Sequence, residues 1–245
     1  MSAQSIQLLS FLDIIGFISI LRVLLSYWTN RDRRTCRRGR VHMRAETGGG
    51  ESQTRGGTAK AERVARVIDS FIDLVLEGNT PPTPEQVRER AGVSSATFYR
   101  YFKSLDDLRG AAVQRAVERF GHLYSVPEIG IGSRSDRIHR FVDSRIALWE
   151  KIHHLDRLTR SRAVRIPAAQ EFVDGMRRVM TATVERHFEP ELRRHSSAER
   201  ASIATSVSVL TSGESWEQFR EAHGFSPFAT GRAWALAIDR VLAAD

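Results

Sequence analysis

The stretch Thr83–Phe102, TPEQVRERAGVSSATFYRYF, decides the fold, because it encodes two short helices joined by a tight turn. Thr83 is suited to cap the first helix, with Gln86 where a capping box needs its second member. Gly92 is suited to the turn, since it reaches a positive φ without the steric cost of a Cβ atom. Ser94 then caps a second helix that is rich in aromatic and polar residues. The pattern predicts a helix-turn-helix, whose second helix enters the major groove of DNA.

Amphipathic helices are expected on both sides of this motif. Before it, an apolar stripe predicts a helix over residues 59–77, with Thr58 as its N-cap. After it, Ser104 is expected to cap a helix that runs to Phe120 and is broken by Gly121. The motif therefore has the neighbours that a three-helix DNA-binding domain needs.

The string AGVSSATFYRYFKSLDDL, residues 91–108, looks like the signature of the TetR family of bacterial transcriptional regulators. The matching features are the Gly-Val of the turn, a Thr two residues before Tyr99, the Tyr-x-Tyr-Phe run, Lys103 and a following Leu-x-x-Leu. The resemblance covers about residues 60–120, with a weaker echo to the C-terminus. It implies an all-α fold, with an N-terminal helix-turn-helix DNA-binding domain over residues 58–120. A C-terminal helical domain for ligand binding and dimerisation would follow over residues 121–245.

The resemblance also implies which residues meet DNA. The predicted DNA-binding set is Thr83, Ser94, Ser95, Thr97, Tyr99, Arg100 and Lys103, the last of them at a position that meets phosphate in the family. Because Ser95 and Ala96 are small, Arg100 is the best candidate for a bidentate contact with guanine. The Tyr99 hydroxyl is better suited to a phosphate. The apolar partners of this face, expected in the core, are Phe98, Tyr101 and Phe102.

Positive charge is unevenly distributed along the chain. Residues 1–44 hold eight arginines and two aspartates, so the rest of the chain carries only +2 of the total charge of +8. The high isoelectric point is therefore no evidence for DNA binding by the globular part. The basic residues that could face phosphate are few and local, namely Arg55, Lys60, Arg63, Arg100 and Lys103. A single cysteine, Cys36, excludes an internal disulfide and any cysteine-based zinc site.

The N-terminal extension has three possible interpretations. Residues 6–28 are apolar and long enough to span a bilayer, but Asp13 and Arg22 roughly cancel the gain from inserting them. The segment could be a membrane anchor on the cytoplasmic face, a docking helix, or upstream sequence translated from a misplaced start codon. In the last case residues 1–42 are absent from the native protein and Met43 is its start. Residues 46–57, rich in glycine, are expected to form a disordered linker.

The C-terminal half reads as helical from Ser133 to the end. The resemblance implies that its last two helices, about residues 198–222 and 227–242, pair with their counterparts in a homodimer. Bulky apolar residues could line a pocket for an unknown small-molecule effector or belong to the ordinary core: Trp149, Phe172, Met176, Met180 and Trp216. Periodicity alone does not separate these two roles.

The sequence shows no catalytic set of residues and no convergent metal ligands. His153 and His154 are adjacent, so on a helix they point about 100° apart and chelate one metal poorly. Residues 213–215, Gly-Glu-Ser, lack the second glycine of a hydrolase elbow. The sequence therefore predicts a protein that is not an enzyme and uses no metal or cofactor. We expect a cytoplasmic, homodimeric, ligand-responsive repressor that binds double-stranded operator DNA. The alternatives are a membrane-tethered form of the same regulator and a dimeric scaffold that does not bind DNA.

Overall fold

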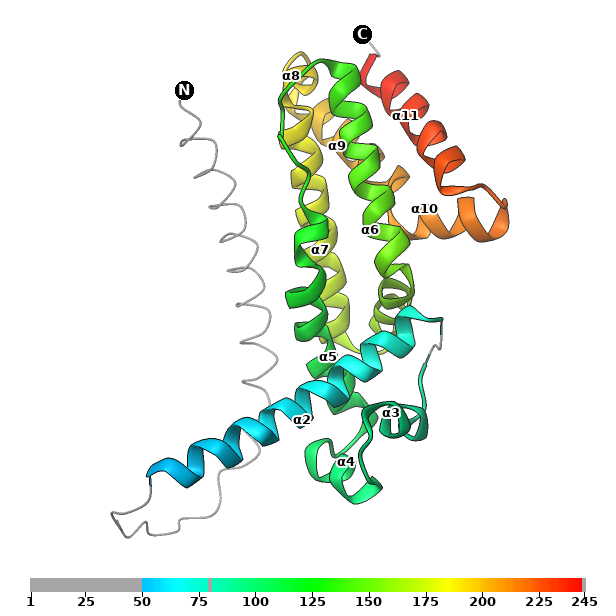
Figure 1. Ribbon diagram of the computed structural model, residues 1–245. Helices are drawn as coiled ribbons and strands as arrows, with labels where there is room; N and C mark the ends of the chain where they lie inside the picture. The colour runs from blue at the N-terminus through cyan, green and yellow to red at the C-terminus, as the bar shows by residue number, and fades with distance from the viewer. Residues whose placement is uncertain (1–49, 79–80, 244–245) are drawn as a thin grey trace.

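The computed structural model describes residues 50–78 and 81–243, with side chains from residue 59 onward. Within these ranges the regular structure is helical and contains no strand. The long helix α2 (Gly50–Leu76) crosses the foot of an upright bundle, and two short helices lie below it (Figure 1). The hydrophobic segment 6–28, the arginine cluster that follows it and Met43 lie outside the described residues.

The helix-turn-helix forms as its caps predict. It consists of α3 (Pro84–Ala91) and α4 (Ser95–Tyr101). The Thr83 side chain accepts from the Gln86 N–H, and the Gln86 side chain accepts from the Thr83 N–H in return. Gly92 ends α3 at φ 65° and ψ 40°, a left-handed conformation that costs a Cβ-bearing residue about 1–2 kcal/mol.

The predicted start of α2 is wrong. The helix begins at Gly50 and not at residue 59, so residues 50–57 of the predicted linker are helical and residue 58 lies inside the helix. Once a helix has nucleated, each further residue adds a hydrogen bond, and no proline lies here to stop its growth toward the N-terminus.

Apolar packing and ion pairs join α2 to the helices at the lower end of the molecule. Helix α5 (Leu105–Phe120) starts at a capping box on Ser104 and packs against α2. Asp69 of α2 accepts two hydrogen bonds of 3.0 Å from Arg115 of α5, and these lower the pKa of Asp69. Phe98 and Phe102 bring the recognition helix into the same core, where each buried side chain contributes about 1.5–3 kcal/mol.

The upper part of the molecule is a helical bundle built on two long helices, α6 (Arg134–Ala163) and α7 (Pro167–His187), which pack along each other (Figure 1). The remaining elements are a 3-10 helix η2 (Gly121–Tyr124), α8 (Glu189–Leu192), α9 (Ser197–Leu210), α10 (Gly213–Glu217), a π-helical turn η3 (Gln218–Ala222) and α11 (Pro227–Ala243).

The helix expected over residues 198–222 is interrupted. Helix α9 ends at Leu210, and Ser212 takes an extended conformation and caps α10. The Trp149 Nε1–H of α6 donates to the Thr211 carbonyl at 2.8 Å, which gives this carbonyl a partner outside its own helix. Local periodicity carries no sign of such a bond, because its donor lies 62 residues away in the chain.

Candidate DNA-binding surface and ligand cavity

Six of the seven predicted DNA-binding residues lie on α4 or just beyond its ends, and the seventh, Thr83, caps α3. Tyr99 is 53% exposed, and Arg100 and Lys103 are exposed beside it. Ser95 and Thr83 are also exposed. On the opposite side of α4, Phe98 is fully buried and makes an edge-on contact with the Tyr99 ring at 5.3 Å. Phe98 thus orients the polar face without taking part in it.

Two residues of the predicted set are used to build the helix itself. The Ser94 side chain accepts from the Thr97 N–H at 3.2 Å, and the Ser94 hydroxyl donates to the Thr97 hydroxyl oxygen at 3.1 Å. Thr97 is only partly exposed. Both hydroxyls therefore stabilise the start of α4.

Tyr101 differs from the expectation that its whole side chain is core. Its ring packs on the core, but the residue is partly exposed. Hydrogen bonds from Arg100, and then from Arg63 of α2, lower the pKa of its phenol. Arg63 of α2 therefore lies close enough to the Tyr101 phenol to affect it, and Arg100 Cζ lies 5.3 Å from the centre of the Tyr101 ring. Sequence reasoning named Arg63 only as one basic residue among several.

A cavity of about 510 Å³ lies where α2 and α5 meet the upper bundle. Its walls come from α2, α5, α6, α7, α9 and α10 and are mainly apolar. Four of the five predicted pocket residues line it: Trp149, Phe172, Met176 and Met180. Trp216 does not line the cavity. It packs against Trp234, with ring centroids 6.1 Å apart. The sequence does not reveal that α5 forms a wall of the cavity, from Arg109 to Phe120, because the same apolar stripe also serves as ordinary core.

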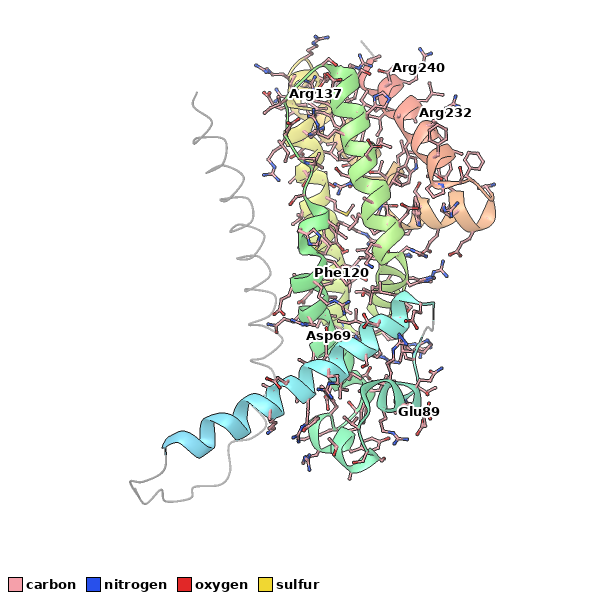
Figure 2. The ribbon with its side chains drawn as sticks, viewed as in Figure 1. Asp69, Glu89, Phe120, Arg137, Arg232 and Arg240 are labelled. Carbon is pink, nitrogen blue, oxygen red and sulfur yellow. The ribbon has the colours of Figure 1, made fainter. Side chains whose placement is uncertain are left out.

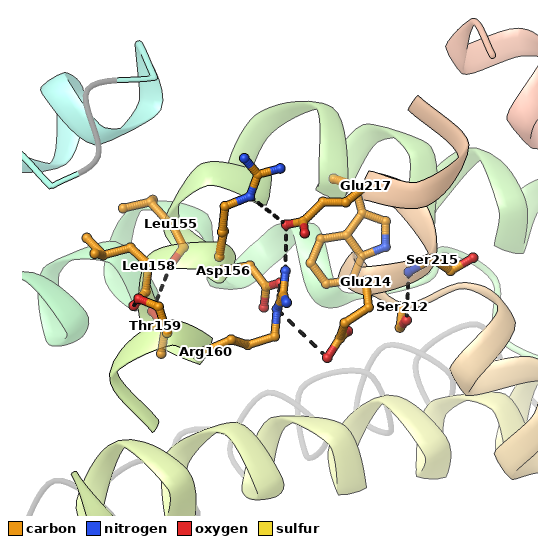
Figure 3. A network of polar contacts seen from close by, with 12 residues as sticks. Leu155, Asp156, Leu158, Thr159, Arg160, Ser212, Glu214, Ser215 and Glu217 are labelled. Carbon is orange, nitrogen blue, oxygen red and sulfur yellow. Dashed lines mark hydrogen bonds and ion pairs between the residues drawn. The ribbon is translucent and has the colours of Figure 1, made fainter. Parts of the chain in front are cut away.

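A network of charged side chains borders the α10 side of the cavity (Figure 3). Arg160 of α6 donates to Asp156 at 2.7 Å and to Glu217 at 2.5 Å. Burial raises the pKa of Asp156 although Arg160 counteracts it. Arg177 of α7 reaches Glu214 at 2.7 Å from the other side.

Tyr124 lines the cavity close to a fully buried arginine, Arg145. Among the described residues no hydrogen-bond partner faces the three guanidinium nitrogens of Arg145, whose positive charge lies 4.8 Å from the centre of the Phe141 ring. Burial lowers the pKa of Arg145 to about 10. Burial likewise raises the pKa of the Tyr124 phenol.

Residues 50–78 and 81–243 contain no group of three or more histidine, cysteine or carboxylate side chains that could hold a metal ion. The adjacent His153 has its Nδ1 2.9 Å from the Trp149 carbonyl oxygen. None of the helices in these ranges has the length and apolar character needed to cross a membrane.

Solved structures with the same arrangement of helices are transcriptional regulators. A TetR-family transcriptional regulator from Streptomyces coelicolor superposes with a TM-score of 0.59 at 18% identity, covering 74% of this chain and 80% of that one. The chain has the TetR-family fold. A transcriptional regulator from Rhodococcus sp. Rha1 superposes with a TM-score of 0.55 at 18% identity, covering 73% of this chain and 95% of that one. No protein-family model and no curated protein matches the sequence.

The TetR-family fold gives the two sites their relative position. Helix α4 lies at one end of the molecule (Figure 1), and α5, the next helix in the chain, forms one wall of the cavity. Helix α4 and the cavity wall α5 are consecutive in the chain, and Ser104 caps the start of α5.

Proposed function

We propose that the chain is a TetR-type transcriptional regulator that binds operator DNA as a homodimer and responds to a small molecule in its cavity. The observation that carries this proposal is the exposed polar face of α4, held in place by the buried Phe98 and Phe102 within a fold of known regulators. The simplest mode of action is repression in the cytoplasm, where the operator lies.

The α4 surface supports separate roles for its basic residues. Arg100 is the candidate for reading guanine, since its guanidinium fits the two acceptors of that base. Lys103 and the Arg63–Tyr101 pair are candidates for phosphate contacts, which position a protein on DNA without reading its sequence. Ser94 and Thr97 contribute mainly by fixing the first turn of α4.

Release of DNA would follow from a change in spacing between the two recognition helices of a dimer. These helices need to be about 34–36 Å apart to enter successive major grooves. A ligand shifts this equilibrium only by the difference between its affinities for the two arrangements. A cavity that borders α5, next to the recognition helix, is well placed to produce such a difference.

The test begins by selecting an operator from random DNA with the full-length protein. Arg100→Ala is then expected to weaken operator binding by about 1–3 kcal/mol and to relax the sequence preference. Lys103→Ala is expected to weaken all sequences alike and to reduce the salt dependence by about one phosphate contact. Fluorescence anisotropy over a series of salt concentrations measures both effects.

The matched control is Arg193→Ala, which removes an exposed arginine at the end of α8 and should leave DNA binding unchanged. An Arg100→Ala variant that binds as tightly as the parent would mean that α4 does not read the groove as assigned. If a folded, dimeric protein selects no DNA sequence, the scaffold alternative replaces the regulator. Recovery of the native chain in membrane fractions would favour the tethered form.

A further inference from the structure

We propose that the cavity binds an amphipathic anion, an apolar body carrying one carboxylate, with the carboxylate held between Arg109 and Arg162. The inference rests on the proposed function in taking the cavity as the effector site. It adds the chemical class of the ligand and the contact through which the ligand acts.

The charges at the α10 side of the cavity are already balanced. Arg160 bonds to Asp156 and Glu217, and Arg177 bonds to Glu214. Arg157, which also pairs with Glu217, has a further partner in Glu221. Each guanidinium there has at least one carboxylate, so an added anion has little to gain on this side.

The other end, where α5 begins and α6 finishes, has an excess of positive charge. Arg109 and Arg162 both line the cavity and share a single carboxylate oxygen, Oδ1 of Asp106. The distances are 3.0 Å from Arg109 Nη1 and 3.4 Å from Arg162 Nη2. The Asp106 side chain is 62% exposed, whereas those of Arg109 and Arg162 are only 19% and 12% exposed.

This sharing leaves the two arginines short of acceptors. Within the described part of the chain, the buried Nε–H groups of Arg109 and Arg162 have no hydrogen-bond partner. Burial lowers the pKa of Arg162, and the nearby charge of Arg109 also contributes. A second carboxylate would reduce the repulsion and supply further acceptors in the planar geometry that guanidinium groups prefer.

The rest of the cavity suits an apolar body and not a second charge. The walls beyond the arginine pair include Val113 of α5, Leu158 of α6, and Phe172 and Met176 of α7. A volume of about 510 Å³ lies within the range of ordinary ligand pockets. A cationic ligand would be repelled by the two arginines at this end. A neutral ligand would leave their positive charges unbalanced.

The same contact suggests how the ligand acts on DNA binding. Asp106 lies in the first turn of α5, immediately after the Ser104 cap that follows the recognition helix. Its bond to Arg162 joins the end of α6 to the start of α5. A ligand carboxylate competes with Asp106 for Arg162 and so weakens the link between α5 and α6. The ligand therefore has different affinities for the arrangement in which the recognition helices fit DNA and for the one in which they do not.

The experiment is calorimetric titration of the full-length protein, without DNA, with octanoate, dodecanoate and hexadecanoate. Dodecanol and dodecylamine are the matched probes of equal chain length. At least one carboxylate is expected to bind, and dodecanol and dodecylamine to bind more weakly than dodecanoate. Arg162→Gln and Arg109→Gln should each weaken binding of the carboxylate about 10- to 100-fold, the effect of losing a charge-assisted hydrogen bond. Asp106→Asn should tighten it, because the competing carboxylate is gone.

Two further variants separate a direct contact from a folding defect. Arg162→Lys keeps the charge and should recover part of the lost affinity, whereas Arg193→Gln, far from the cavity, should bind like the parent. The proposal is overturned if no carboxylate binds, if dodecanol or dodecylamine binds as tightly as dodecanoate, or if Arg162→Gln retains full affinity. Because the titration contains no DNA, these outcomes leave the operator-binding test of the proposed function untouched.

Discussion

His187 is fully buried in α7, and both of its ring nitrogens have backbone partners. Its Nε2 lies 2.9 Å from the Arg137 carbonyl oxygen, and its Nδ1 accepts from the Gly130 N–H at 3.4 Å. A carbonyl only accepts and an N–H only donates, so this arrangement requires the neutral ring with its proton on Nε2. Burial accordingly lowers the pKa of His187 from its ordinary value of 6.5, and the charges of Arg140, Arg137 and Arg145 add to the effect.

This histidine should make the stability of the protein depend on pH. Above pH 6.5 the ring is neutral in both states and has no effect. Below that value the unfolded chain takes up a proton that the folded chain does not, so stability falls as the pH falls. Chemical denaturation of the parent and of His187→Gln between pH 5 and pH 8, about the range where histidine titrates, measures the difference. We expect the free energy of unfolding of the parent to lose its advantage over that of His187→Gln below pH 6.5. A difference between the two proteins that stays constant with pH would contradict the assignment of a neutral His187.

The surroundings and partners of individual polar side chains were the hardest features to predict from the sequence. Arg145 lies among the buried apolar residues of α6, but the sequence does not show that Phe141 and Tyr124 surround it. The hydrogen bonds of Tyr101 to Arg100 and Arg63 likewise depend on how α2 crosses α4.

Local capping signals marked the starts of three helices correctly, whereas Thr58 did not cap α2, which begins at Gly50. Thr83, Ser104 and Ser133 all cap the helices that follow them, each through a capping box completed three residues later. The break between α9 and α10 was missed, since it depends on a bond from Trp149 and on the close approach of Gly213 to α6. A Cβ atom at Gly213 would lie 2.3 Å from Asp156 Oδ2 and 3.2 Å from Trp149 Cζ3.

Gly213→Ala should therefore destabilise the protein by about 1–3 kcal/mol, the usual cost of overpacking. Asp156 cannot easily move away from the added methyl group, because it is buried and bonded to Arg160 at 2.7 Å. The matched control is Gly231→Ala in α11, where the nearest atom is at an ordinary 3.4 Å and alanine favours the helix. Thermal unfolding of both variants is the measurement. Equal midpoints would show that the α9–α10 junction is looser than its geometry suggests.

At the scale of the whole molecule, large apolar side chains on the last helices are left uncovered in the single chain. Phe228 and Leu236 of α11 are 76% and 61% exposed, and Val209 of α9 is 64% exposed. Arg232 and Arg240 extend from α11 on the side turned away from α6 (Figure 2). Large exposed apolar side chains of this kind are typical of interfaces, and a symmetric dimer would cover them.

A double variant, Phe228→Glu with Leu236→Glu, is expected to convert the proposed dimer to a monomer, because it places charges in an apolar interface. Sedimentation velocity at micromolar concentration measures the mass. Val164→Glu is the matched control, since Val164 is 83% exposed but lies between α6 and α7, away from α11. A parent protein that sediments as a monomer would refute the dimer itself.

The sequence by itself determined the helix-turn-helix, the all-helical class and the residues that α4 exposes. Each of these depends on signals within a few residues of one another: a capping hydroxyl, a glycine at positive φ, an apolar stripe. Only the tertiary structure decided the extent of the cavity, the break at Thr211 and the sharing of Asp106 by Arg109 and Arg162. These features join side chains that are far apart in the chain, 56 residues in the case of Arg162 and Asp106. A helix period states which side of a helix is apolar, but it does not state which other helix that side meets.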